Sequence, residues 1–251
     1  DYLFMQNNAY AIPVSNTAIS TVCHPTLAEL NYYRAMLKQK GIVDISKCFS
    51  QVIQNLLTQE TLDLFEEKSL RRDFHSRHTD TPRHMFTVGE RVIAESSQLI
   101  KNFYYSHQVL QLISDIAQEK IDHLPWTGER FVINALIQNN DTHGWHWDDY
   151  AYALVFIAKC PPRGFGGEVE CVAHTHWDRG NPKIADILQL NPIQSHYFTP
   201  GSFYLMRSDT TLHRVAGIAA PHKRLSIAMS YCNQADLEKN IDHKTVIDLY
   251  S

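Results

Sequence analysis

The order of patterns along the chain predicts an α+β protein in which a barrel-like β-sandwich is backed by helices. Helical periodicity dominates the first 125 residues, and short apolar runs separated by Gly- and Pro-containing turns follow. Helices followed by many closely spaced strands favour this architecture, because each sheet must bury its apolar face. No internal repeat or linker interrupts the pattern. We therefore expect one domain over residues 1–251, with helical support to about residue 125 and the β core over about 126–251.

The first clear helix is predicted shortly after Cys23. Thr26 and Glu29 have the spacing of a capping box, apolar residues recur on one face, and Gly41 marks the end of the helix. The segment before this helix is only weakly periodic, and Ile12-Pro13-Val14 is its candidate edge strand.

Helical spacing returns from about Ser50, with a break expected near Thr58. It appears again over residues 95–119, where Ser106 would cap the second of two helices. Residues 69–93, between these helices, are rich in Arg and His and contain a Pro, which predicts a solvated loop. Beside an active site, an Arg of such a loop can also clamp a substrate carboxylate with its planar guanidinium.

Strand signals begin after Pro125. The apolar runs there are short, and turn residues such as Pro161-Pro162 and Gly166-Gly167 separate them. The six predicted strands are Phe131–Ile137, Tyr152–Ala158, Val169–Ala173, Ile187–Leu190, Ser202–Met206 and Leu225–Tyr231.

The composition restricts the class of protein. With 251 residues, of which 44% are hydrophobic, the chain can bury a full core, and its net charge of -4 argues against nucleic-acid binding through bulk electrostatics. Its five cysteines are scattered, which predicts free thiols in a reducing compartment. The chain has no 18-residue apolar stretch and no signal-like N-terminus. We expect a soluble, cytoplasmic protein whose partner is a small molecule, neither nucleic acid nor a membrane.

One twelve-residue stretch, Asn139–Tyr150, gathers two His, three Asp and two Trp between two predicted strands. His146 and Asp148 are two residues apart, so an extended backbone directs both side chains to one face. They supply two ligands of a 2-His-1-carboxylate site, which holds Fe(II) and leaves three coordination positions open. His213, far downstream, is the candidate for the third ligand.

A second His-x-Asp pair, His176 and Asp178, shows that the short pattern alone is weak evidence. Gly, Asn and Pro flank it and no apolar run follows closely, which predicts an exposed loop, with substrate contact as the less favoured alternative. The first pair lies between two predicted strands and is the better candidate for a metal site. Packing roles are favoured for Trp145 and Trp147, and one of them is a candidate for the pocket wall.

The last predicted strand is preceded by a cation and carries a hydroxyl near its start. Arg224 lies eleven residues after His213. On a neighbouring strand, its guanidinium would be free to bind a dicarboxylate in the metal pocket. Ser226 would point the same way, since alternate residues of a strand share a face.

The order and separation of His146, Asp148, His213, Arg224 and Ser226 resemble the motif of the Fe(II)/2-oxoglutarate-dependent oxygenases, and the resemblance covers roughly residues 129–232. The resemblance implies a double-stranded β-helix, which is a jelly-roll, cupin-like core, with the N-terminal helices packed on one sheet. It also implies His146, Asp148 and His213 as catalytic metal ligands, and Arg224 and Ser226 as the anchor of 2-oxoglutarate. The implied cofactors are Fe(II), 2-oxoglutarate as co-substrate, and O2, with succinate and CO2 released.

A closer resemblance lies in Thr142–Tyr150 and the upstream Gly128-Glu129-Arg130. These segments are similar to the group that contains the free-lysine radical halogenases and their hydroxylase relatives. In the halogenases the position that matches Asp148 is Gly, which opens a coordination position for chloride. Because this chain keeps the carboxylate, the resemblance implies the hydroxylating branch.

The resemblance to the lysine enzymes also implies a substrate site, with Glu129, His143 and Asp149 near the substrate amines and Arg83 near its carboxylate. Each residue has an alternative structural role. Glu129 could pair with Arg130, His143 could hydrogen bond within its own loop, and Asp149 could orient groups around the metal. Arg83 shares its segment with four other arginines.

These features favour a hydroxylase of a free amino acid, with L-lysine, oxidised at an unactivated side-chain carbon, as the favoured substrate. Two alternatives stay open. The same chemistry could act on another amino acid or on a carrier-bound substrate. A cupin-like protein could instead hold a structural or regulatory ion without oxygenase activity, but a structural site needs no 2-oxoglutarate anchor such as Arg224.

Overall fold

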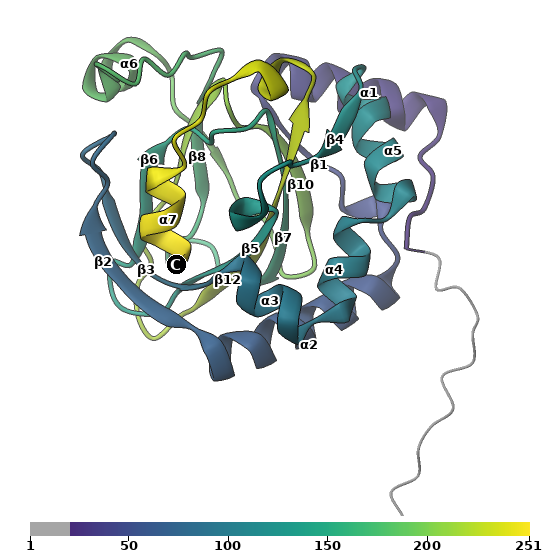
Figure 1. The fold of residues 1–251 in the computed structure, drawn as a ribbon, viewed down its shortest axis with the longest axis horizontal. Helices are drawn as coiled ribbons and strands as arrows, with labels where there is room; N and C mark the ends of the chain where they lie inside the picture. The colour runs from purple at the N-terminus through teal and green to yellow at the C-terminus, as the bar shows by residue number, and fades with distance from the viewer. Residues whose placement is uncertain (1–20) are drawn as a thin grey trace, which may run out of the picture.

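The computed structural model describes residues 21–251 and consists of a curled antiparallel β-sheet with helices packed around it (Figure 1). The predicted class, an α+β protein with a jelly-roll core and N-terminal helices on one sheet, is confirmed. The candidate edge strand Ile12–Val14 lies outside the described residues. No helix in the described range has the length and apolar content to span a membrane.

The elements fall into two runs along the chain. Those before residue 125 are α1 (Leu27–Lys40), β1 (Ile42–Asp44), η1 (Ser46–Cys48), α2 (Gln51–Lys68), β2 (Leu70–His75), β3 (Pro82–Val88), α3 (Glu90–Ser96), α4 (Gln98–Tyr104), α5 (His107–Ala117) and β4 (Ile121–His123). Those after it are η2 (Thr127–Glu129), β5 (Phe131–Leu136), β6 (Thr142–His146), β7 (Tyr152–Lys159), β8 (Val169–Ala173), α6 (Ile184–Leu190), β9 (Gln194–His196), β10 (Phe203–Arg207), β11 (Thr211–Val215), β12 (Arg224–Asn233), η3 (Ala235–Glu238) and α7 (Lys244–Tyr250). Strands before residue 125 and helices after it make the boundary between support and core less sharp than predicted.

The N-terminal helices follow the sequence signals in most respects. The capping box of α1 is present, with Thr26 and Glu29 bonded reciprocally, and Gly41 ends the helix at a φ of 71°. The break predicted in α2 near Thr58 is wrong. The Thr58 hydroxyl donates to the Gln54 carbonyl at 2.8 Å, so the helix accommodates it without interruption.

The helical region over residues 95–119 is confirmed as two helices, α4 and α5. Ser106 occupies the N-cap position of α5, but its side chain makes no capping hydrogen bond. The solvated loop predicted over residues 69–93 is wrong, because this segment forms the β2–β3 hairpin and α3. Pro82 stands at the first position of β3, where a missing N–H is tolerated, and burial alternates from there along the strand.

Five of the six predicted strands are confirmed, and the strand predicted at Ile187–Leu190 is wrong. This run lies in α6, where Ile184, Ile187 and Leu188 have helical spacing and pack against a buried cluster that contains Trp145 and Trp147. A short apolar run does not by itself distinguish a helix from a strand, and only this packing decides it.

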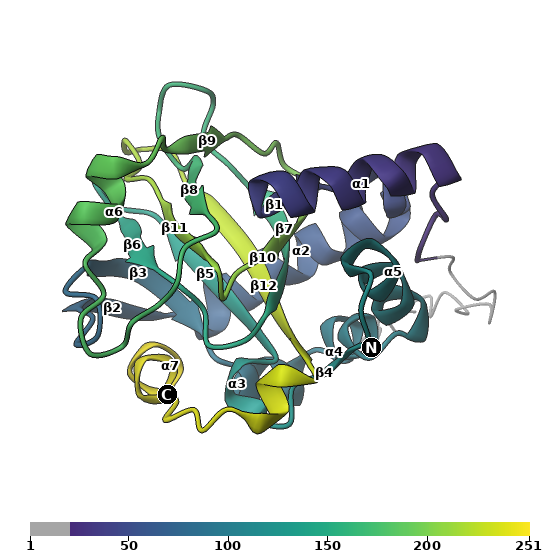
Figure 2. The ribbon, with the colours of Figure 1, turned by 90° about the horizontal axis from the view of Figure 1, so that it is seen from above.

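The sheet brings distant segments together in the order β1-β10-β7-β12-β5-β3-β6-β11-β8-β9, with β2 paired to β3 and β4 to β12. Leu225, Ile227 and Met229 of β12 belong to the main core, which includes residues of α1, α2, α4 and α5. The alternate residues Arg224 and Ser226 therefore face the interior of the curled sheet. Helix α7 lies well apart from α1, beside β3 and η2 (Figure 2).

Candidate active site

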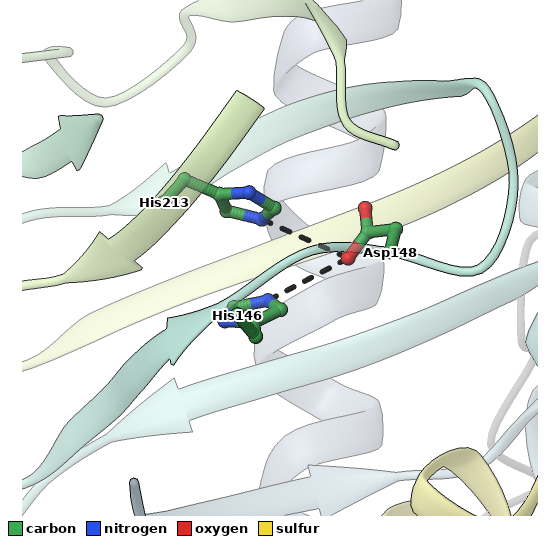
Figure 3. Close-up of side chains that lie close together, drawn as sticks. All are labelled: His146, Asp148 and His213. Atoms are coloured by element: carbon green, nitrogen blue, oxygen red, sulfur yellow. Dashed lines mark ion pairs between the residues drawn. The ribbon is translucent and has the colours of Figure 1, made fainter. Parts of the chain in front are cut away.

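The register of two strands brings the three predicted metal ligands together. Strands β6 and β11 are antiparallel neighbours, and His213 is paired directly with His146 (Figure 3). Asp148 follows two residues after the end of β6. Its Oδ1 lies 3.5 Å from His146 Nε2 and 3.7 Å from His213 Nε2. Because all three ligand atoms lie within 4.8 Å of one another, a single ion could contact them together.

Hydrogen bonds orient both imidazoles. His146 Nδ1 lies 2.7 Å from the Gly144 carbonyl oxygen, and His213 Nδ1 lies 2.8 Å from that of Thr211. A carbonyl only accepts, so each Nδ1 carries the proton and each Nε2 keeps its lone pair. Burial, with His143 and His213 nearby, lowers the pKa of His146 well below its usual value. The neutral ring is the form that binds a metal.

Asp148 completes a donor set that fits Fe(II). Its backbone N–H donates to the Ser208 carbonyl at 3.2 Å, which fixes the loop after β6. Burial raises the pKa of the Asp148 carboxyl, and a bound cation would favour its ionised form. Two neutral imidazoles and one carboxylate are the donors of the facial sites that bind non-haem Fe(II). That His146, Asp148 and His213 are metal ligands stays a prediction.

A cavity extends from this triad to the start of β12, and we call it the inner chamber. Arg224 is only 3% exposed at its end. The guanidinium donates from Nε to the Gly167 carbonyl at 3.1 Å and from Nη1 to Ser226 Oγ at 3.0 Å. It forms no ion pair with a described residue. A buried, oriented cation of this kind fits one end of a dicarboxylate such as 2-oxoglutarate.

A second cavity, the outer chamber, shares Glu129, His143 and two of the predicted metal ligands, His146 and Asp148, with the inner one. All four predicted substrate residues line it. Five of its polar side-chain atoms are buried and have no hydrogen-bond partner among the described residues. They are Ser76 Oγ, Arg83 Nε, Glu129 Oε2, His143 Nε2 and Trp177 Nε1. Buried polar groups are rarely left unpaired, so this concentration indicates a polar ligand.

Arg83 is the most informative of these groups. The residue is 1% exposed, its Nη1 donates to Thr81 Oγ1 at 2.9 Å, and its Nε has no partner. It makes no ion pair in residues 21–251. Burial lowers the pKa of the guanidinium to about 10, so it stays charged at neutral pH. A buried charge without a counter-ion is costly, and a carboxylate would satisfy it.

The acidic side of the outer chamber holds Glu129 and Asp149. Burial, with Asp149 and Asp148 nearby, raises the pKa of Glu129 well above its usual value. The alternative pairing with Arg130 is absent, because that guanidinium donates to the carbonyls of Leu124 and Pro125. Asp149, in contrast, is paired with Arg179.

The aromatic residues and the second His-x-Asp pair follow the sequence interpretation. His143 stacks on His146 with ring centroids 4.0 Å apart. Trp147 lines the outer chamber, whereas Trp145 packs against neighbouring strands. His176 and Asp178 are both exposed, as expected for a loop.

Sequence reasoning missed several residues in and beside the outer chamber. Trp177, from the loop between β8 and α6, lines it, as do Val246, Leu249 and Tyr250 of α7. Arg179, from the same loop, does not line the chamber but pairs with Asp149, which does. The helix carried a usable signal, since these three apolar residues have i, i+3, i+4 spacing. The loop carried none beyond the second His-x-Asp pair, which lies around Trp177.

A family comparison adds to this geometry. Residues 26–251 match the model of the family described as Halogenase D. The chain belongs to the halogenase D family. A comparison with curated proteins finds no match.

Several solved structures share the fold of this family member. The epimerase SnoN from nogalamycin biosynthesis has a TM-score of 0.63 and 13% identity, over 82% of this chain and 83% of that chain. AviO1 from Streptomyces viridochromogenes Tue57 has a TM-score of 0.62 and 13% identity, over 84% and 98%. A prolyl hydroxylase from Trichoplax adhaerens, in complex with a peptide fragment, has a TM-score of 0.59 and 14% identity, over 85% and 94%. At these identities the similarity supports the fold alone.

Proposed function

We propose that this chain is an Fe(II)/2-oxoglutarate-dependent dioxygenase that hydroxylates a free amino acid, with L-lysine as the favoured substrate. The observation that carries the proposal is that two chambers meet at one triad, and each contains a buried arginine without a carboxylate partner among residues 21–251. Arg224 offers its charge on one side and Arg83 on the other. Membership of the halogenase D family supports it. So does SnoN, whose structure was solved in complex with Fe3+ and α-ketoglutarate.

The residues fit these groups by their chemistry. His146, Asp148 and His213 would hold the iron, and Arg224 with Ser226 would hold the distal carboxylate of 2-oxoglutarate. When bound, iron with 2-oxoglutarate and O2 supplies an oxidant strong enough to attack an unactivated C–H bond. The chain's own contribution is orientation, because Gly144 and Thr211 fix the two rings and Gly167 fixes the arginine.

The outer chamber would hold a zwitterion. The unpaired Nε of Arg83 offers a hydrogen bond to the α-carboxylate, and Glu129 and Asp149 offer charge to ammonium groups. His143 stays neutral, since burial and Arg83 lower its pKa well below the usual value, and so it adds no repulsion toward an amine. Trp147 and Tyr250 line the chamber and exclude water from the reacting carbon.

Asp148 supports hydroxylation over halogenation within this family. In the halogenases that the sequence resembles, Gly leaves a coordination position to chloride. Here the Asp148 carboxylate lies within 3.7 Å of both imidazoles, where it would take that position.

The test is succinate release by the Fe(II)-loaded protein in air with 2-oxoglutarate, screened across free amino acids, with product mass recorded. Lysine-dependent succinate with a gain of one oxygen is the expected result. A matched pair of variants controls the site, because His146→Ala should abolish turnover and His176→Ala, in the exposed second motif, should not. Stimulation by another amino acid or by a carrier-bound substrate would keep the chemistry and discard lysine. Failure to bind iron and 2-oxoglutarate would leave a non-catalytic metal-binding protein as the alternative.

A further inference from the structure

Besides Arg83, a second cation of the chain, Arg179, reaches an acidic group of the outer chamber. Arg179 donates from Nη2 to Asp149 Oδ1. The carbon at the centre of its guanidinium lies 3.9 Å from the centroid of the Trp177 ring. The Asp149 side chain is 5% exposed, whereas that of Arg179 is 39% exposed. The acid is thus part of the chamber, and its partner reaches it from the solvent side.

An aromatic face beside a buried carboxylate is a general cation-binding site. Both parts attract ammonium and guanidinium groups alike, through the ring quadrupole and through charge-assisted hydrogen bonds. Asp149 has no ion-pair partner other than Arg179 in the part of the chain that the structure describes. Glu129, which lines the same chamber, has none, and its Oε2 is unpaired. One of the two acids is therefore already neutralised by the protein.

We propose that Arg179 is a resident cation that a doubly cationic substrate must displace from Asp149 and Trp177. The inference rests on the proposed function and names a residue that determines specificity. A neutral amino acid has one ammonium, which Glu129 can neutralise while Arg179 stays in place. Lysine has two, and its second ammonium competes with Arg179. Because the Arg179 side chain is partly exposed, it can leave toward solvent without any change in the sheet.

The test compares binding by titration calorimetry on anaerobic protein loaded with Fe(II) and 2-oxoglutarate. In Arg179→Ala, lysine should bind about tenfold more tightly, since the Arg179–Asp149 ion pair, exposed only on its arginine side, and a cation–π contact no longer oppose it. Norleucine, which has no side-chain ammonium, should change less than about twofold. Methylguanidinium, added as a free mimic of the missing group, should bind to Arg179→Ala and compete with lysine.

Arg163→Ala is the matched control. Arg163 lies 4.3 Å from the centroid of the Tyr197 ring and has no ion-pair partner among residues 21–251. Removing it leaves an aromatic face without a buried acid, so methylguanidinium should not bind there. The comparison of the two variants distinguishes a specific cation-binding site from the general tendency of arginine to stack on aromatic rings.

The binding results either uphold or overturn the role of Arg179. Weaker lysine binding in Arg179→Ala, or no binding of methylguanidinium to it, would overturn the proposal and make Arg179 a structural support of Asp149. Binding of methylguanidinium with no lysine binding in either protein would uphold the cation site and reject lysine as the substrate. The failure of the proposed function and that of the resident cation are thereby distinguished.

Discussion

The two chambers that meet at the triad differ in how completely their polar groups are satisfied. At the far end of the inner chamber, Arg224 is held by Gly167 and Ser226. In the outer chamber five buried polar atoms have no partner in the described chain, and two of them, Glu129 Oε2 and His143 Nε2, belong to residues that also line the inner chamber. The arginine end of the inner chamber is pre-organised for one ligand, whereas the unpaired groups of the outer chamber would be satisfied only by a ligand. We infer that the groups for iron and 2-oxoglutarate lie on or beside the strands of the sheet. The groups that select the substrate lie mainly on the elements around the sheet.

The supporting elements explain this difference. Strand β12 lies between β7 and β5, so hydrogen bonds on both sides fix the positions of Arg224 and Ser226. The outer chamber draws on the β2–β3 hairpin, the loop before α6, and α7. Loops and terminal helices vary more readily than central strands, and they are common places for substrate-binding residues.

The largest effect should come from Asp148, one of the two predicted metal ligands that both chambers share. Asp148→Gly removes one of three predicted protein ligands, so iron affinity and succinate formation should fall by more than about 100-fold. Iron content after desalting and succinate release measure the two losses. Asp178→Gly, in the exposed second motif, is the matched control and should retain both. Unchanged hydroxylation in Asp148→Gly would remove Asp148 from the metal site, whereas chloride incorporation would agree with the resemblance to halogenases.

The second change affects the inner chamber alone. Arg224→Ala deletes a buried cation, and losing such a partner costs about 3 kcal/mol, or roughly 100-fold in 2-oxoglutarate affinity. Amino acid affinity should change far less. Arg214→Ala is the control, because that side chain is 38% exposed and pairs with Glu170 outside the chambers. If 2-oxoglutarate bound equally well to Arg224→Ala, its anchor would have to lie elsewhere.

The third change affects the outer chamber alone. Arg83→Lys keeps the charge but loses the planar fork, so the KM for the amino acid should rise roughly tenfold. The 2-oxoglutarate requirement should stay constant, and initial rates with each component varied separately measure both. The exposed Arg77→Lys should leave both unchanged. Equal effects of Arg83→Lys on both requirements would mean that the chambers do not act separately.

More of the functional residues of the inner chamber than of the outer chamber could be predicted from the sequence, and the reasons are physical. His146, Asp148, His213, Arg224 and Ser226 lie on or beside strands, and period 2 with a shared register determines which way such residues face. Trp177 and Arg179 lie in a loop whose position depends on tertiary packing, which no local pattern encodes. Arg83 shows both effects. The family resemblance identifies it, but the sequence pattern predicts a loop where the structure has β3, because the Pro at the start of the strand and its charged neighbours obscure the alternation.

The smallest expected effect concerns Glu129. It tests whether ionisation of this buried carboxyl destabilises the folded protein. Burial raises the pKa of Glu129 well above its ordinary value in the folded protein. The folded state therefore holds the proton more tightly than the unfolded state. The contribution of this group to stability is fully present below the unfolded pKa, and it is lost as pH rises through the folded pKa.

Glu129→Gln cannot lose a proton, so its stability relative to the native protein should increase with pH over that interval. The gain should be on the order of 1 kcal/mol per pH unit. Thermal unfolding of metal-free protein between pH 4 and 8 measures it. In an Asp149→Asn background the gain should shrink, because Asp149 is one of the charges that raise this pKa. A Glu129→Gln difference that stayed constant with pH would mean that Glu129 ionises equally easily in the folded and unfolded states, so that the outer chamber does not disfavour its charge.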